Sequence, residues 1–282
     1  MSILTIAREY GSGGKEIGRK VAERMGYEYV DRGRILEDMR KIGAQWEELA
    51  KYFDENEPDV WERFEWSFRG YVALVQLHIL QYALQDNIVI MGRGGNFLLK
   101  GIPHVLRIRT MAPIEKRIEK VMQWQETNSE NAEWLIKRAD KEMAGAVYLI
   151  YGFVWDDPAQ YDMLFDTGLQ TYDAIVEAIA KELQAREGLK TEKAVKLLEL
   201  KVLAAKIDAE LTTDNTLRIS SLDVKLKEEG LVEYGLIVSG AVYANEDISR
   251  VKDITNRIAG SAPIEYDLHF RWQSRMGHPQ YK

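Results

Sequence analysis

The feature that most constrains the fold is residues 3–26, ILTIAREYGSGGKEIGRKVAERMG, where an apolar run meets a glycine cluster and then a helical pattern. A strand that stops at glycines and leads directly into a helix turns backbone N–H groups toward one point before the helix. Lys15 follows the glycines, where the pattern G-x-x-x-x-G-K-[ST] has its lysine. The stretch predicts a phosphate-binding loop made of Gly11, Ser12, Gly13, Gly14, Lys15 and Glu16.

Two positions of this loop depart from the pattern. Glu9 replaces the first glycine, and Glu16 replaces the Ser or Thr that would hold Mg²⁺. Because a carboxylate beside phosphates is repulsive, Glu16 either points away or contacts a metal directly or through water. A plain turn with a solvated lysine is the alternative. A dinucleotide-binding loop ranks lower, because G-x-G-x-x-G starting at Gly11 requires glycine at position 16.

The first two thirds of the chain alternate short apolar runs with helical patterns. Strands are predicted at residues 2–7, 28–31, 87–92, 104–109 and 161–167. Helices are predicted at residues 15–25, 34–53, 59–85, 113–125, 129–150 and 171–186. This alternation indicates an α/β fold, a parallel sheet flanked by helices.

The pattern changes after residue 186. A long helical stretch lies within residues 188–211, followed by alternating runs at 222–230 and 232–243, a helix at 248–260 and a last alternating run at 264–272. The order α-β-β-α-β predicts a small α+β domain. The charged stretch QAREGLKTEK carries no apolar run, so we expect one domain over residues 1–186 and a second over 190–282.

Composition narrows the classes of function. A formal net charge of -7 argues against a general nucleic-acid binder, which presents a basic face. The chain has no cysteine, and its four histidines lack ligand spacing, so no thiolate or histidine metal site is expected. The N-terminus does not resemble a secretory signal, and the longest apolar stretch is too short to span a bilayer. We expect a cytoplasmic protein.

Several motifs together resemble a known family. In order, IAREYGSGGKEIG, YVDRGRIL, VIMGRGGNFLL, TMAPIEKRI, IKRADKEMA and WDDPAQYDMLFDT are similar to the cytidylate-kinase-like proteins, divergent relatives of the P-loop nucleoside-monophosphate kinases. The resemblance covers about residues 1–182. The segment after it resembles a BON domain, a small module that binds ligands or surfaces, in its element order and its LIVSGAVY strand.

The resemblance implies ATP on the glycine loop, with Mg²⁺ held mainly by phosphate oxygens and water. It implies Arg93 as the ligand of an acceptor phosphate, although kinases of cytidylate usually read G-R-D here and this chain has Gly94. Asp31 and Arg32 end the second strand, where ligands of α/β folds bind. A helix N-cap is an equally good interpretation of Asp31.

The resemblance also implies a basic lid over the nucleotide. Arg138, Asp140 and Lys141 are its candidates, but Met143 stands where the family has an arginine. Arg138 would neutralise charge on the phosphoryl group in transfer, together with Lys15 and Arg93. Arg117 is expected to reach either the phosphates or a nearby acid such as Glu115.

Three functions follow from these residues. The first is ATP-dependent phosphoryl transfer to a CMP-like nucleoside monophosphate. The second is a non-catalytic nucleotide sensor that signals through the C-terminal module to a protein or small-ligand partner, favoured by Glu16, Gly94 and Met143. The third is a scaffold whose site is filled by side chains. Nucleotides are the expected ligands, and the sequence leaves a homo-oligomer open.

Overall fold

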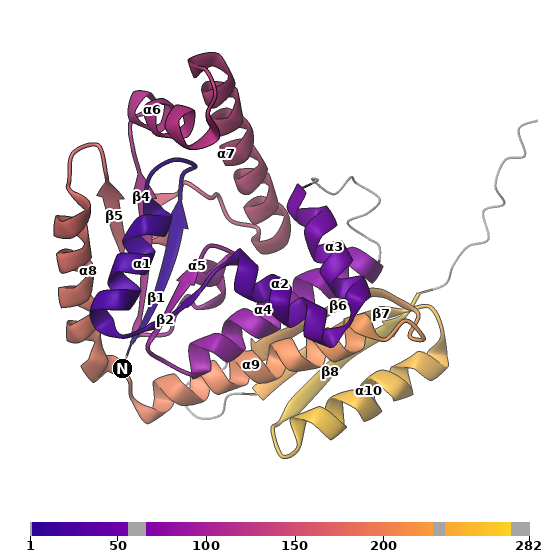
Figure 1. Ribbon diagram of the computed structural model, residues 1–282. Helices are drawn as coiled ribbons and strands as arrows, with labels where there is room; N and C mark the ends of the chain where they lie inside the picture. Colours follow the sequence, from indigo (N-terminus) through magenta and orange to yellow (C-terminus); the bar gives the residue numbers. More distant parts are fainter. Residues whose placement is uncertain (1, 56–65, 228–234, 272–282) are drawn as a thin grey trace, which may run out of the picture.

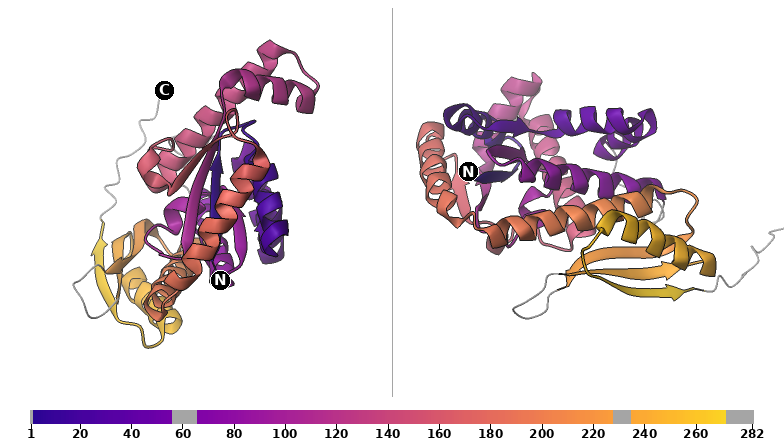
Figure 2. Two further views of the ribbon diagram at one scale, coloured as in Figure 1. Left: turned by 90° about the vertical axis from the view of Figure 1, so that its left-hand side faces the viewer. Right: turned by 90° about the horizontal axis from the view of Figure 1, so that it is seen from below.

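The computed structural model describes residues 2–55, 66–227 and 235–271 (Figure 1). A central parallel sheet carries helices on both faces, and a smaller sheet lies at the end of the molecule away from α6 and the start of α7 (Figures 1 and 2). Within these ranges, every helix is either too short or too polar to span a bilayer.

The strands run in the order that the sequence predicts, with helices between them. The first part comprises β1 Ile3–Arg8, α1 Gly14–Met25, β2 Glu28–Val30, α2 Arg32–Ile42, α3 Ala44–Glu55, α4 Trp66–Leu84, β3 Ile88–Met91, α5 Gly95–Leu98, β4 Val105–Met111, α6 Ile114–Gln125, α7 Ser129–Tyr151, the 3-10 turn η2 Pro158–Gln160, β5 Met163–Asp166 and α8 Tyr172–Arg186. The second comprises the 3-10 turn η3 Glu187–Leu189, α9 Glu192–Thr213, β6 Ile219–Lys227, β7 Gly235–Val242, α10 Asn245–Ala259 and β8 Ile264–Phe270.

The large sheet has the strand order β2-β3-β1-β4-β5, and every neighbouring pair is parallel. Strand β1 lies in the middle, so Ile3 aligns with Ile88 of β3 and Val105 of β4. All five carboxyl ends therefore meet at one edge of the sheet. That edge carries the glycine loop.

The two faces of the large sheet are buried by different helices. Alternate side chains of β1 explain this, because Leu4 and Ile6 pack toward α1 and α8 while Ile3 packs toward α2, α4 and α9. The helix after β1 and the short helix after β3 consequently lie on opposite faces. The carboxyl ends of β1 and β3 therefore lie side by side where the chain leaves to opposite faces, the place where open parallel sheets bind ligands. This place is called the crevice below.

One predicted helix differs from those observed, and another is described only in part. One helix predicted at 34–53 is wrong: the chain forms α2 and α3, separated at Gly43, whose extended backbone ends α2. Of the helix predicted at 59–85, residues 66–84 form α4, and 59–65 lie outside the described residues. The short α5 was not predicted.

The C-terminal segment has the predicted order α-β-β-α-β. Strands β6 and β7 are antiparallel, β7 and β8 are parallel, and α9 and α10 cover one face of this sheet. Helix α9 also packs against the core of the large sheet through Leu198 and Ala209. Its Ile207 and Leu211 belong to the core of the small sheet. The domain boundary near residue 187 stays a prediction, since one helix contributes to both cores.

Candidate functional site

The glycine loop joins β1 to α1 as predicted. Gly11 and Gly13 adopt φ values of 84° and 83°, a region that favours glycine. Packing is equally restrictive, because a Cβ atom at Gly13 would lie 2.0 Å from the Tyr172 hydroxyl and one at Gly14 2.5 Å from Thr110 Oγ1. No side chain caps α1, whose N-cap is Gly13. The first turn of α1 therefore keeps the N–H groups that suit an anion.

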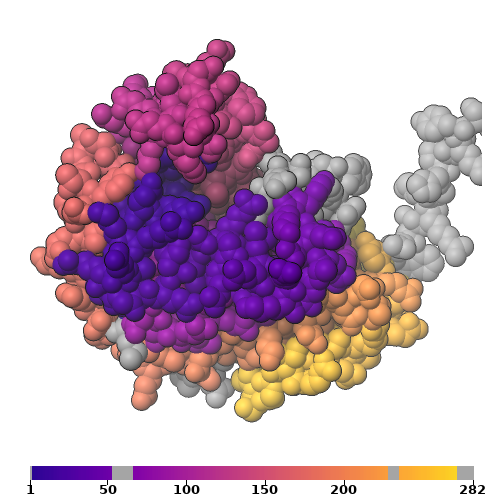
Figure 3. Space-filling model, viewed as in Figure 1, coloured from indigo at the N-terminus to yellow at the C-terminus, as the bar shows by residue number. Residues whose placement is uncertain are grey.

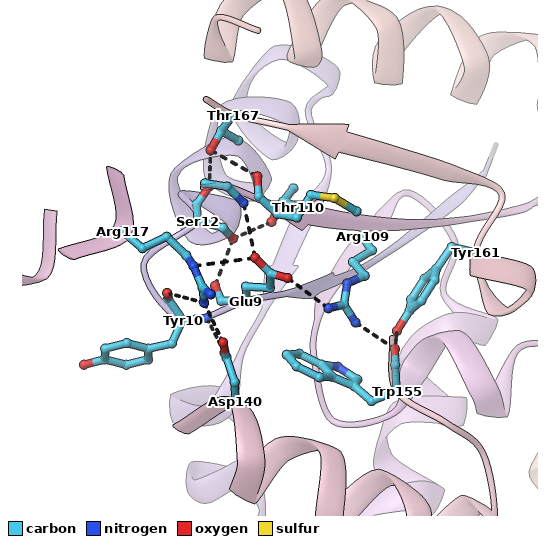
Figure 4. A network of polar contacts seen from close by, with 12 residues as sticks. Glu9, Tyr10, Ser12, Arg109, Thr110, Arg117, Asp140, Trp155, Tyr161 and Thr167 are labelled. Atoms are coloured by element: carbon cyan, nitrogen blue, oxygen red, sulfur yellow. Dashed lines mark hydrogen bonds and ion pairs between the residues drawn. The ribbon is translucent and has the colours of Figure 1, made fainter. Parts of the chain in front are cut away.

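Ser12 holds the loop in shape. Its hydroxyl donates to the Glu9 carbonyl at 2.9 Å and lies 3.0 Å from Thr110 Oγ1, and its carbonyl accepts from Thr167 Oγ1 at 2.9 Å (Figure 4). The side chain is fully buried. Contact of Ser12 with a phosphate would therefore require its backbone N–H. That N–H donates to the Glu9 carbonyl at 3.1 Å.

Lys15 and Glu16 lie in the first turn of α1 and differ in their contacts. Lys15 is exposed and forms no ion pair with any described residue. Glu16 forms an ion pair with Lys120 of α6 at 2.7 Å. Partial burial disfavours the charged carboxylate, but the Lys120 and backbone hydrogen bonds and the nearby Lys15 lower the pKa of Glu16 below its usual value. Glu16 is thus held by a lysine beside the loop.

Glu9 anchors a network on the α6 and α7 side of the loop (Figure 4). Its carboxylate lies 3.2 Å from Arg109 Nη2 and 3.6 Å from Arg117 Nε, and it accepts from the Ala112 N–H at 3.2 Å. Arg109 is 4% exposed and stacks over the Trp155 ring, with its Cζ 4.1 Å from the ring centroid. Sequence reasoning missed Arg109, whose only signal was an arginine near the end of an apolar strand.

Asp140 completes this network from helix α7. Its Oδ1 accepts from the Tyr10 N–H at 3.0 Å, and its Oδ2 lies 2.5 Å from Arg117 Nη1. The nearby acid predicted for Arg117 is therefore Asp140, together with Glu9, rather than Glu115. Two carboxylates and two arginines balance each other here. Asp140 joins the predicted lid helix to the backbone of the loop.

Arg93 follows β3 and lies across the crevice from the loop. Its φ is 56°, its Nη1 donates to the Tyr71 hydroxyl at 3.1 Å, and its carbonyl accepts from the Tyr151 hydroxyl at 2.9 Å. A Cβ atom at Gly94 would lie 2.2 Å from the Tyr151 ring. Burial raises the pKa of Tyr151, so its hydroxyl stays a donor. The ring occupies the space that an aspartate at position 94 would need.

Asp31 and Arg32 lie at the start of α2, near the same crevice. The N-cap interpretation of Asp31 is confirmed, because its Oδ1 accepts from the Gly33 N–H at 2.9 Å. Arg32 is exposed. Contact of either residue with an acceptor stays a prediction.

The predicted lid helix is packed in its central part. Met143 joins an apolar cluster with Phe97, Val147 and Trp155. Arg138 lies two residues from Asp140, on the opposite side of α7, where it pairs with Glu142 at 2.5 Å and is 51% exposed. Lys141 is exposed as well. The structure brings Asp140 to the loop, whereas Arg138 lies on the opposite side of α7. The predicted roles of Arg138 and Lys141 stay predictions.

One further arginine lies in the crevice. Arg8 ends β1, and a Cβ atom at Gly92 would lie 2.3 Å from its Nη1. The site therefore presents cations on two sides, with Lys15 at the helix start and Arg8 beside Arg93. No group of three His, Cys, Asp or Glu side chains within residues 2–55, 66–227 and 235–271 could hold a metal ion.

Comparisons with known proteins agree with this geometry. The chain matches the model of the cytidylate kinase-like family over residues 3–169. It is 31% identical over 201 residues to a cytidylate kinase of Pyrococcus furiosus, covering 68% of this chain and 96% of that protein. A cytidylate kinase of Methanopyrus kandleri is 27% identical over 197 residues, covering 66% and 96%.

A solved structure shares the fold. An uncharacterized protein from Eubacterium ventriosum superposes with a TM-score of 0.53 at 19% identity, covering 65% of this chain and 98% of that one. The family match ends at residue 169, so the BON-like assignment of the C-terminal segment stays a prediction. The first part has the parallel sheet and glycine loop of a P-loop kinase fold, and the chain belongs to the cytidylate kinase-like family.

Proposed function

We propose that the protein is an ATP-dependent nucleoside-monophosphate kinase that transfers the γ-phosphoryl group of ATP to a CMP-like acceptor. The carrying observation is the placement of Lys15 and Arg93 on two sides of one crevice, at the carboxyl edge of the sheet. Figure 3 shows α6 and α7 above the N-terminal segment that contains the glycine loop. Family membership and the two cytidylate kinase relatives support the choice of a nucleotide substrate.

Each group has a role in this proposal. The loop N–H groups and Lys15 bind the donor phosphates, and Arg93 binds the acceptor phosphate with its planar fork. Tyr71 and Tyr151 position Arg93 from its side chain and its carbonyl. Bringing the two phosphates together while cancelling their charge is most of what phosphoryl transfer requires.

Magnesium fits the site only as a partner of the phosphates. Glu16 is engaged by Lys120, and Glu9 by two arginines, so the loop presents no uncommitted carboxylate. Bound Mg²⁺ would be held by phosphate oxygens and water, and would neutralise charge between the phosphates.

A nucleotide sensor is the second candidate. Met143 is packed in the apolar cluster, and Arg138 pairs with Glu142 away from the loop. Without a lid arginine, the domain would bind nucleotide and transmit binding through α9, which packs against both cores. A scaffold with a filled site is less well supported, since the Lys15 side chain is exposed.

Calorimetry combined with a coupled assay of ADP production separates these functions. We expect ATP to bind the wild type, and Lys15→Ala to weaken binding by about 10- to 100-fold, the size of a charge-assisted hydrogen bond. Lys20→Ala is the matched control, because Lys20 lies on the same helix and pairs with exposed Asp173. A panel of CMP, UMP, AMP and GMP identifies the acceptor.

The outcomes are distinct. ADP production that depends on one monophosphate supports the kinase. ATP binding without turnover on any acceptor favours the sensor. If millimolar triphosphate fails to bind, both functions are excluded.

A further inference from the structure

Arg8 lies between the two phosphate subsites of the proposed kinase. It is the last residue of β1, and its Cβ would be 2.7 Å from a Cβ atom built on Gly14, the first residue of α1. Its guanidinium reaches over Gly92, the residue before Arg93, where a Cβ atom would lie 2.3 Å from Nη1. Arg8 thus extends from the donor loop to the acceptor side of the crevice between β1 and β3.

The charge of Arg8 lacks a matching acid. No carboxylate of a described residue lies within ion-pair distance of its guanidinium, and Asp31, which interacts with it electrostatically, accepts from the Gly33 N–H. Burial and the nearby Arg93 lower the pKa of Arg8, opposed by Tyr29 and Asp31. An arginine stays protonated in proteins, so this partly buried cation has no ion-pair partner among the described residues. An anion placed in the crevice would satisfy it.

Glycine keeps the space around this guanidinium open. Gly92 has a φ of 70°, which favours glycine, and any side chain there would displace Arg8 from the crevice. The family's lid arginine is missing at Met143, which is packed among aromatic side chains. The position of Arg8 is suited to supply that charge from the sheet.

We propose that Arg8 contacts the phosphoryl group during transfer and neutralises the charge on its equatorial oxygens. This inference rests on the proposed kinase function. In that step an acceptor phosphate oxygen forms a bond to the γ-phosphorus of ATP. The bond from that phosphorus to the β,γ-bridging oxygen breaks, and ADP leaves with its electron pair. Arg8 neither gains nor loses a proton.

The test compares Arg8→Gln and Arg8→Lys with wild type in steady-state kinetics. We expect kcat to fall about 10³-fold or more in Arg8→Gln, the range for an arginine that meets the transferred group. The KM values for ATP and acceptor should stay within about threefold, because the contact forms in the transition state. Arg8→Lys should retain more activity, because it keeps the charge without the planar fork.

Two further measurements guard against a structural explanation. Added guanidinium ion should partly restore kcat in Arg8→Ala and leave wild type unchanged. Arg24→Gln is the control, since Arg24 is half-exposed on α1 and pairs with Glu177. Thermal unfolding of each variant identifies loss of fold, and Arg8→Lys provides the measurement should Arg8→Gln not fold.

The outcomes that overturn the inference are specific. An active wild type with Arg8→Gln kcat within about threefold would overturn it while leaving the kinase function in place. A rise in acceptor KM at unchanged kcat would assign Arg8 to acceptor binding instead. A wild type that binds ATP without turnover on any acceptor would instead remove the kinase function on which the inference rests.

Discussion

The arginines on the two sides of the glycine loop differ in whether they have an ion-pair partner. On the side of α6 and α7, Arg109 and Arg117 meet Glu9 and Asp140 within ion-pair distance. In the crevice between β1 and β3, Arg8 has no such acid among the described residues. An arginine near a phosphate site is therefore not automatically a phosphate ligand. We call a charged side chain matched when it has an ion-pair partner among the described residues, and unmatched when it has none. The matched arginines hold the loop, whereas the unmatched Arg8 is available to an anion.

The matched side should be the more costly to disrupt. Glu9→Gly restores the first glycine of the pattern G-x-x-x-x-G-K-[ST] but leaves Arg109, 4% exposed, without its carboxylate. Removing one partner of a buried pair costs roughly 3–5 kcal/mol, so we expect a loss of that size in the free energy of unfolding, measured by urea denaturation.

The control for Glu9→Gly is Glu177→Gln, which removes an exposed pair with Arg24 and should change the stability by less than ~1 kcal/mol. If Glu9→Gly were equally mild, Arg109 and Arg117 would not depend on Glu9. The distinction between the two sides would then be lost.

A second prediction concerns the crevice side, where Tyr151 covers Gly94. Gly94→Asp restores G-R-D but places a Cβ 2.2 Å from the Tyr151 ring. We expect a cost of about 2–3 kcal/mol from overpacking and backbone strain, falling to about 1 kcal/mol in a Tyr151→Ala background, where only the strain remains. A double-mutant cycle of unfolding free energies measures the coupling.

Gly101→Asp is the matched control for Gly94→Asp. Gly101 has a φ of 87°, similar to the 73° of Gly94, but nothing within 4 Å of its built Cβ. Backbone strain alone should cost about 1 kcal/mol there. Equal costs at both positions would mean that Tyr151 does not exclude the aspartate.

Local signals explain what the sequence could predict of this site. The strand-glycine-helix order, the position of Lys15 after the glycines and the Asp31 cap each depend on neighbours within a few residues. The break between α2 and α3 is also local, but Gly43 alone did not indicate it against a continuous helical pattern.

The charge network could not be predicted in the same way. Glu9 and Arg109 are 100 positions apart along the chain, and Tyr10 and Asp140 are 130 apart. Which arginine meets which acid depends on strand order and on the docking of α7, and periodicity carries neither. Arg8 was overlooked for the same reason, because its isolation is visible only once all surrounding acids have been placed.

The third prediction concerns an acid without an ion-pair partner, Asp208, which lies on α9 where this helix packs against α4. Asp208 has no ion pair with a described residue, and burial, opposed by Arg69 and aided by Asp223, raises its pKa to about 6. A raised pKa means that its stabilising protonated form is lost as pH rises from about 4 through 6. Asp208→Asn should therefore raise stability by about 1–2 kcal/mol at pH 8 and leave it unchanged at pH 4.

Thermal unfolding at both pH values checks this, with Asp173→Asn as control because its side chain is 84% exposed. A pH-independent effect of Asp208→Asn would show that Arg69 already compensates the carboxylate. Asp208 would then count as matched, and the contrast drawn for Arg8 would not extend to it.

The smallest effect is expected at Glu16, which belongs to the matched class but lies at the surface. Its pKa is lowered despite partial burial, through Lys120, its backbone hydrogen bond and Lys15, so its contribution is present above the ordinary value of 4.5 and is lost as pH falls through the lower folded value. Because the side chain is 49% exposed, Glu16→Gln should cost less than ~1 kcal/mol at pH 7 and nothing at pH 2. Lys120→Met should remove most of that difference. A larger cost that survives Lys120→Met would mean that Glu16 acts through another group, and that matching at the mouth of the loop is not simply an ion pair.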